Sequence, residues 1–546
     1  MKRKMDIWTA ALITGWVIIG LMLVYPLYSI VTASFTSNTT GDWSLENYLA
    51  VFRQKQYYRA LANTFIGGFG GMCGALILGI TLAACVTRFQ VKGRAFISTI
   101  AVMALVTPPF IGAYAWIILF GANGVVRKGL MSLGLTIPPI YGVWGVILVF
   151  SLKLFPHVFL LTSAALQNID SSLDDAAESL GMSPMQRFLK VTLRLITPAV
   201  TASALLTFIL AIADFGTPRF IGRSFQMLST EAYVLFSSET GGNPGMASAI
   251  SILLLLIALV FVILQRWAAR HDLSQGSKGR TRVPAPLKGL KSLAVHGASY
   301  LIIFAGILPT LVVILFSFRK TRGPVFQPGF SLDSYKAVLD DVPLALGNSL
   351  AFSAASVSAI VIAGAVLGYV IVRRRGLLST GFDAVLMVPY IVPGIVMGIA
   401  YAATFNSGAV VLTGTGFIII AATFIRRLPY GMRAMIASLH QVSPSIEQAG
   451  VSLGYHPGRV FTKVTVPLIA PGILAGAIMS FVTAMNELST TLVLYIGSTI
   501  TMPVKIYTLV SNGEYGTGSA LSTILLTITG LLVYFAFKVG RGRQMM

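Results

Sequence analysis

The chain has 546 residues, of which 55% are hydrophobic and only 11% are charged, and its formal net charge at neutral pH is +22. Soluble domains carry about 25% charged residues, so this composition excludes an ordinary soluble protein and indicates a membrane protein. The positive charge alone does not indicate nucleic-acid binding, because no groove-forming pattern of basic and aromatic residues accompanies it.

Long apolar stretches recur along the whole chain, and a bilayer core requires about 20 such residues per helix. There are twelve, with soft boundaries, over residues 8–32, 60–87, 95–120, 138–165, 193–213, 247–265, 295–317, 349–372, 382–405, 409–425, 466–485 and 518–537. Glycine is frequent, as expected where helices approach closely in lipid, whereas a barrel would show short alternating segments. The sequence therefore predicts an all-α membrane protein with twelve transmembrane helices.

Basic residues fall mainly on one side of this predicted membrane. If the N-terminus is cytoplasmic and the chain alternates through twelve spans, cytoplasmic segments hold 27 of the 40 Lys and Arg residues. Arg426, Arg427 and Arg433 are counted among them, in the loop after the tenth span. This positive-inside bias predicts a multi-pass protein of the bacterial cytoplasmic (inner) membrane with both termini in the cytoplasm.

The polar loop between the fourth and fifth spans, residues 166–192, carries a clear local pattern. Asp170 is a good N-cap for a short helix, and Gly181 can supply the left-handed turn that ends it. Ser183 and Gln186 then form a capping box that opens a second helix. We expect a compact helix–Gly–helix unit, the first knob, suited to docking into a groove on a soluble partner.

The segment 266–292 is rich in Arg, Lys, Gly, Ser and Pro, which predicts a flexible cytoplasmic linker. It divides the chain into a first half, residues 1–265, and a second half, residues 293–546.

The two halves repeat one another. Residues 174–181 (DDAAESLG) match residues 447–454 (EQAGVSLG) at an offset of 273, which is half of 546. The same offset pairs Asp214 with Glu487, and the pairing continues upstream with small shifts. Each half therefore holds six spans, and an even number makes the repeat parallel, with a pathway expected between the halves.

The second knob lies in the loop 439–465. Ser443 and Pro444 open its first helix, Gly454 breaks it, and Pro457 starts the next helix.

Both knobs resemble the EAA loop of bacterial ABC importer permeases, whose pattern is EAA, three residues, Gly, nine residues and Ile-x-Leu-Pro. The matching residues are Asp175, Ala176, Ala177, Gly181, Val191 and Leu193 in the first half, and Gln448, Ala449, Gly450, Gly454, Val464, Val466 and Pro467 in the second. The sequence departs from the pattern at Gln448, which replaces the acidic residue, and at Arg194, which replaces Pro. The resemblance covers essentially the whole chain, and the fused layout, with ADFGTPRFIG and NELSTTLVLYIG, is most similar to ferric-iron-type permeases.

The resemblance implies the partners. Each knob would seat in a cleft of one of two ATP-binding ATPase subunits, and a periplasmic or lipid-anchored binding protein would deliver the solute. The chain itself would be a permease in membrane lipid with no catalytic residues and no cofactor, and it contains no phosphate-binding GxxxxGK[ST] loop. Ferric iron is the first expectation for the solute, and phosphonate, thiamine or a phosphorylated sugar are the alternatives.

Ionisable residues inside spans are unfavourable in lipid and therefore indicate function. Asp214 and Glu487 lie near the outer end of the fifth span of each half, where together they would form a mouth that attracts cations. The alternative is that each caps a loop helix or faces the water outside. Pro108 and Pro393 lie in or beside the third spans and would break these helices along a pathway, although membrane helices tolerate Pro. No spacing of His or Cys resembles a metal site.

Two other functions stay open, an ion-coupled secondary carrier and a channel. Carriers usually place charged residues deep in their spans for coupling, whereas the span middles here are nearly free of charge. Lys153 and Asp383 are the ambiguous residues, near span ends. The knobs have no purpose in a carrier or a channel, which favours the importer.

Overall fold

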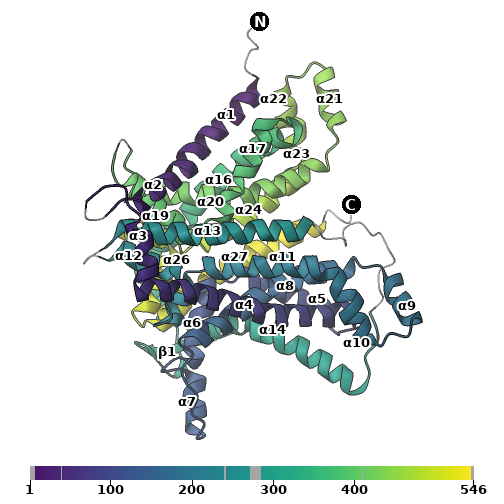
Figure 1. Ribbon diagram of the computed structural model, residues 1–546, viewed down its shortest axis with the longest axis vertical. Coiled ribbons are helices and arrows are strands. Elements are labelled where there is room, and N and C mark those ends of the chain that lie inside the picture. Colours follow the sequence, from purple (N-terminus) through teal and green to yellow (C-terminus); the bar gives the residue numbers. More distant parts are fainter. Residues whose placement is uncertain (1–5, 38–39, 239–241, 271–283, 409, 543–546) are drawn as a thin grey trace.

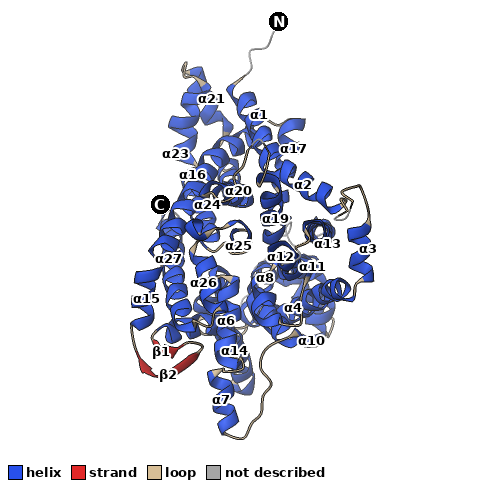
Figure 2. Cartoon of the chain, turned by 90° about the vertical axis from the view of Figure 1, so that its left-hand side faces the viewer, coloured by secondary structure: helices blue, strands red, loops and turns tan. Residues whose placement is uncertain are grey.

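The computed structural model describes residues 6–37, 40–238, 242–270, 284–408 and 410–542 (Figure 1). Residues 271–283 of the linker predicted at 266–292 lie outside the described residues, while its first residues belong to the helix that ends at Arg270 and its last to the helix that begins at Gly289. The described part is mainly helical, as the sequence predicts, and loops join the helices. Its two strands lie in the second half and form a small antiparallel hairpin, drawn red in Figure 2.

The elements of the first half are α1 (Ile7–Ile19), the π-helical turn η1 (Gly20–Val24), α2 (Tyr25–Ser34), α3 (Glu46–Arg53), α4 (Lys55–Arg88), α5 (Arg94–Val106), α6 (Pro109–Phe120), α7 (Val125–Ser132), α8 (Val143–Gln167), α9 (Ser171–Ser179), α10 (Pro184–Gln186), η2 (Arg187–Thr192), α11 (Leu193–Ala213), η3 (Pro218–Gly222), α12 (Leu228–Ser237) and α13 (Pro244–Arg270).

The elements of the second half are α14 (Gly289–Ser317), β1 (Arg319–Arg322), β2 (Val325–Phe330), α15 (Asp333–Asp341), α16 (Pro343–Arg373), α17 (Leu377–Leu386), α18 (Val388–Ile391), α19 (Gly394–Phe405), α20 (Gly416–His440), α21 (Pro444–Ser452), α22 (Pro457–Val460), η5 (Phe461–Thr465), α23 (Val466–Leu468), α24 (Ala470–Met485), α25 (Thr491–Leu494), η6 (Gly497–Thr499), α26 (Met502–Ser511) and α27 (Tyr515–Gly542).

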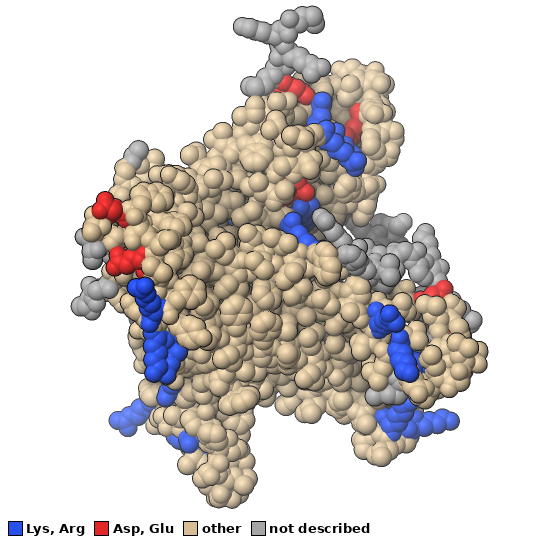
Figure 3. Space-filling view, viewed as in Figure 1, with Lys and Arg blue, Asp and Glu red and all other residues tan. Residues whose placement is uncertain are grey.

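Nine helices of the described part are long and apolar enough to cross a membrane, and eleven spans result if each of two bent pairs counts as one. The helix α20, where the sequence predicts a tenth span, is not among them and contains three arginines. The total of twelve spans therefore stays a prediction. On the face shown in Figure 3, charged side chains gather at the left and right, near the top and in one group in the upper middle, and a wide area of the centre is uncharged. A surface in contact with lipid is expected to have such an uncharged area.

The first helix of each half packs against the other half. The helices α1 and α2 lie against α16, α17 and α19, whereas α14 lies against α4, α5 and α6. Small residues allow this close approach: a Cβ on Gly15 would lie 2.8 Å from Leu367, and one on Gly306 would lie 2.8 Å from Phe155. Helices in lipid associate through such close packing and through hydrogen bonds. The exchange of first helices between the halves therefore holds the two halves together.

The third span of each half is broken at a proline. In the first half α5 ends and α6 begins around Pro108, and in the second half α19 begins after Pro393. The bend in the second half, between the helical segments Leu377–Ile391 and Gly394–Phe405, is 104°. Proline forces such a break because it lacks the backbone N–H and disfavours helical geometry in the residue before it.

Candidate coupling and ion-pair sites

The first knob has the predicted helix–Gly–helix geometry. Asp170 caps α9 by accepting a hydrogen bond from the Ser172 N–H at 2.9 Å. Gly181 takes the left-handed conformation, with φ +76°, and its N–H donates to the Glu178 carbonyl at 2.8 Å. The second helix then opens with the capping box that the sequence predicts, in which Ser183 and Gln186 exchange two hydrogen bonds.

The second knob repeats this geometry at the corresponding place. Ser443 caps α21, and Gly454 ends it with φ +86°. The Gly454 N–H donates to the Val451 carbonyl at 2.9 Å, and His456 caps the next helix through its Nδ1 atom. In Figure 1, α9 and α21 both project from the body of the molecule, on the right and at the upper right. We call the side that carries them the knob face.

The residues of the EAA-like pattern divide into an outer and an inner set. The side chains of Asp175, Ala176, Gln448 and Ala449 are exposed. Ala177 is buried, and Gly450 lies so close to Val460 that a Cβ would approach its Cγ2 atom to 3.0 Å. The exposed set therefore forms an outward surface, while the small inner residues let each knob fold onto its own second helix.

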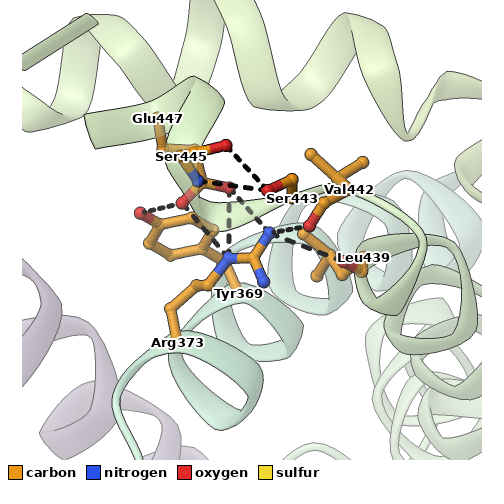
Figure 4. A network of polar contacts seen from close by, with 7 residues as sticks. All are labelled: Tyr369, Arg373, Leu439, Val442, Ser443, Ser445 and Glu447. Carbon is orange, nitrogen blue, oxygen red and sulfur yellow. Dashed lines mark hydrogen bonds and ion pairs between the residues drawn. The ribbon is translucent and has the colours of Figure 1, made fainter. Parts of the chain in front are cut away.

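Two residues that the pattern does not include fasten the second knob to the membrane helices. Glu447 is buried, and its Oε1 atom lies 3.0 Å from Nη2 of Arg373, the last residue of α16 (Figure 4). The sequence offered only weak signals for this pair, since Glu447 immediately precedes the motif and Arg373 begins a run of three arginines.

Asp214 and Glu487 are both buried, and each is held by basic residues. Lys153 lies 2.8 Å from Asp214 Oδ2, and Arg426 lies 2.6 Å from Glu487 Oε2, which Arg427 also contacts. Asp214 also accepts a hydrogen bond from the Gly216 N–H, and Glu487 accepts one from the Thr490 N–H. The mouth of two cation-attracting carboxylates stays a prediction; in the structure each carboxylate caps the backbone that follows it and pairs with a base.

The basic partners lie well inside their helices. Lys153 is ten residues after Val143, the start of α8, and Arg426 is ten residues after Gly416, the start of α20. Ten residues of helix span about 15 Å, and both helices have 25 residues. Arg426 and Arg427 therefore lie inside a helix, and their assignment to a loop was wrong. The helix continues through these arginines because a carboxylate distant in sequence neutralises them.

In the second half the ion pair also holds the break of the third span. Arg426 Nη1 donates to Thr490 Oγ1 at 2.8 Å, and Thr490 Oγ1 donates to the Gly394 carbonyl at 3.1 Å. A Cβ on Gly394 would lie 2.9 Å from Arg426 Nη1. The residue after Pro393 must therefore be very small for the arginine to reach Glu487.

Each half has a small cavity next to its ion pair. In the first half the cavity is lined by Pro108 and Lys153 together with Pro309 and Thr310 of α14. In the second half Glu487 lines a cavity with several hydroxyl-bearing side chains, those of Ser349, Ser353, Thr423, Thr491 and Thr501. Among the described residues, no group of three or more His, Cys, Asp and Glu side chains is placed to hold a metal ion.

Comparison with known proteins gives relatives along the whole chain. Ferric transport system permease protein FbpB of Actinobacillus pleuropneumoniae is 26% identical across 98% of this chain and 78% of its own length. Fe(3+)-transport system permease protein FbpB 2 of Haemophilus influenzae is 28% identical across 98% of this chain and 100% of its own. PhnV of Salmonella choleraesuis, named for 2-aminoethylphosphonate transport, is 27% identical across 45% of this chain and 95% of its own.

The sequence profile of one family matches the chain twice, over residues 75–271 and 360–539, once in each half. Each match contains one of the two knobs and one of the two buried ion pairs. Because the matches cover more than half of the chain, this protein belongs to the family of binding-protein-dependent transport system inner membrane components.

Proposed function

We propose that this chain is the fused, two-half permease of an ATP-driven importer, in which both knobs dock onto ATPase subunits and a binding protein delivers the solute from the other side. The observation that carries the proposal is the duplicated helix–Gly–helix knob at corresponding places of a fused, two-half permease. The knob face is then cytoplasmic, which agrees with the excess of basic residues in the segments assigned to that side.

The exposed surface of the knobs suits a protein partner. Leu180 and Leu453, which occupy equivalent positions, are 79% and 78% exposed at the tips of the knobs. Docking would remove these large apolar side chains from water, which is favourable. With two knobs, the chain offers one docking point to each of two ATPase subunits.

Ferric iron is the solute that the comparisons favour. Two relatives that match along nearly the whole chain are named for ferric transport, whereas a relative named for 2-aminoethylphosphonate transport matches 45% of it. One observation favours the phosphonate alternative. Arg426 and Arg427 face a single carboxylate, Glu487, and this surplus of positive charge would attract an anion.

We place the pathway between the two halves, beside the broken third spans at Pro108 and Pro393. Asp214 and Glu487 would support its wall through their ion pairs, so their negative charge would not be available to draw in cations. Because both halves contribute a broken span and a buried pair, opening would require movements in both.

The proposal is tested by reconstituting the permease in liposomes with the ATPase and binding protein encoded beside it, and measuring uptake of radioactive ferric iron. ATP-dependent uptake that excess 2-aminoethylphosphonate does not inhibit supports the ferric assignment. Inhibition by the phosphonate would favour the alternative solute. Uptake that needs an ion gradient and no ATP would instead support a secondary carrier.

A further inference from the structure

The second knob is attached to the end of a long membrane helix by a two-pronged ion pair. Arg373 Nε lies 3.1 and 3.2 Å from the two oxygens of Glu447, and its Nη2 atom lies 3.0 Å from Oε1 (Figure 4). The same Nη2 atom donates to the Val442 carbonyl at 2.7 Å. One guanidinium therefore binds both α21 and the loop that leads into it.

This attachment is rigid. Planar guanidinium–carboxylate pairs fix direction as well as distance, and the Arg373 and Glu447 side chains are only 12% and 10% exposed. If α21 rotated relative to α16, it would separate two largely buried charges, which is strongly unfavourable. The helix α16 has 31 residues, or about 45 Å of length, and Arg373 fastens the knob to its C-terminal end.

The same joint also contacts the first half. Tyr369, one turn before Arg373, donates from its hydroxyl to Glu447 Oε2 at 3.2 Å. The ring of Trp8, in α1, lies 4.4 Å from the Tyr369 ring and 5.2 Å from the Phe461 ring, between ring centroids. Since α1 is the first helix of the other half, the second knob has a direct contact with each half of the permease.

The tyrosine belongs to the second half alone. The offset that pairs Arg373 with Arg88 places Ala84 at the position equivalent to Tyr369. The first half therefore lacks both the phenol and the ring at this position, so the two knobs differ in how they connect to the membrane helices.

We infer that Arg373 is a positioning residue that makes the second knob and α16 move as one body, and that Trp8 carries this movement into the first half. The inference rests on the proposed function, because the movement it transmits is the closure of the ATPase subunits. By this inference, residues outside the EAA-like pattern link the docking of an ATPase subunit to the opening of the pathway.

The test compares Glu447→Gln with Arg374→Gln in the complex of permease, ATPase and binding protein. Glu447→Gln keeps the shape of the side chain but removes its charge. Arg374 is the adjacent arginine, and its pair with Asp6 is exposed, with side-chain exposures of 56% and 41%, so losing it should have little effect. The readouts are permease level, ATPase co-purification, ATP hydrolysis and uptake of radioactive ferric iron.

We expect Glu447→Gln to retain ATPase co-purification within twofold, because the outward surface around Leu453 is unchanged. Uptake should fall at least tenfold, and ATP hydrolysis should no longer respond to the loaded binding protein. Arg374→Gln should remain within twofold of the unmodified permease in every readout. Arg373→Lys, which keeps the charge but not the two-pronged geometry, should give an intermediate uptake.

Full uptake by Glu447→Gln, or an equal loss in Arg374→Gln, overturns the inference. So does a loss of ATPase co-purification in Glu447→Gln, because the pair would then shape the docking surface. If Glu447→Gln fails to insert, Tyr369→Phe tests the inference instead. We expect Tyr369→Phe to lower uptake two- to fivefold at a normal permease level. Unchanged uptake in this variant would overturn the inference. An unmodified permease with neither ATPase association nor ATP-driven uptake contradicts the proposed function itself.

Discussion

Lys153 and Arg426 occupy the same place in the two halves, and each holds the carboxylate that follows the fifth span of its own half. Lys153 contacts Asp214 at 2.8 Å, and Arg426 contacts Glu487 at 2.6 Å. The offset of 273 that aligns the two knobs also aligns both members of these pairs. Each half therefore has an ion pair with a buried carboxylate at the same place, with lysine as the base in the first half and arginine in the second.

Neutralising either carboxylate should destabilise the permease. Asp214→Asn leaves Lys153 without its counter-charge, and breaking a buried pair in this way lowers the free energy of unfolding by about 3–5 kcal/mol. Glu487→Gln should have the larger effect, because two arginines lose their partner. Thermal unfolding of the purified protein in detergent measures both changes.

The matched control is Asp383→Asn. Its pair with Arg433 joins α17 to α20 in the second half, but the two side chains are 29% and 44% exposed, so the loss should be below about 1 kcal/mol. The double change Lys153→Met with Asp214→Leu should recover only part of the stability, because it leaves no unpaired charge but removes the acceptor for the Gly216 N–H. Unaltered stability of Asp214→Asn would show that the pair does not form.

Gly394→Ala should disturb the break of the third span in the second half. Its added methyl would lie 2.9 Å from Arg426 Nη1 and 3.2 Å from Glu487 Oε1, and such overpacking typically lowers stability by about 1–3 kcal/mol. The control is Gly112→Ala, in the broken span of the first half, where a Cβ meets nothing within 4 Å. Thermal unfolding of both variants measures the difference, and equal behaviour would contradict the close approach at Gly394.

Reporter fusions test the topology. Fusions after residue 275, which lies outside the described residues, and at the C-terminus should both report a cytoplasmic position. A fusion at Gly323, in the turn of the β1–β2 hairpin, should report the opposite side, because the 29-residue helix α14 separates it from the linker. A cytoplasmic signal at Gly323, or a periplasmic one at residue 275, would disprove the arrangement of six spans in each half.

The parts that the sequence predicts well are those encoded locally. The capping residues Asp170, Ser183 and Ser443 and the left-handed glycines Gly181 and Gly454 each act within a few residues of chain. Their side-chain and backbone chemistry is therefore sufficient to predict both knobs, and comparing the halves then reveals the repeat.

The parts that the sequence does not predict depend on contacts between distant residues. Arg426 is interpreted as a loop residue until Glu487, 61 positions away, is known to neutralise it. Arg373 and Glu447 are 74 positions apart, and the exchange of first helices places Trp8 against Tyr369. The hairpin was missed because hydropathy patterns locate spans and carry little information about short polar connections between them.

The central claim is that the knobs transmit the movement of the ATPase subunits. Gly181 and Gly454 have φ values of +76° and +86°, and a Cβ on either would meet nothing within 4 Å. A valine there strains only the local backbone, by about 1 kcal/mol or more, and should reorient the knob without disturbing the spans. Gly134→Val is the matched control, since Gly134 has φ +80° and open surroundings but lies outside both knobs.

The decisive measurement is ATP-driven uptake and ATPase co-purification for Gly181→Val and Gly454→Val at matched permease levels. The account predicts that both variants insert normally, that ATPase binding or uptake falls at least fivefold in each, and that the two knobs differ in sensitivity. It also predicts that Gly134→Val behaves like the unmodified permease. Full ATPase association together with full ATP-driven uptake in both knob variants would contradict the account and restore the secondary carrier as the better explanation.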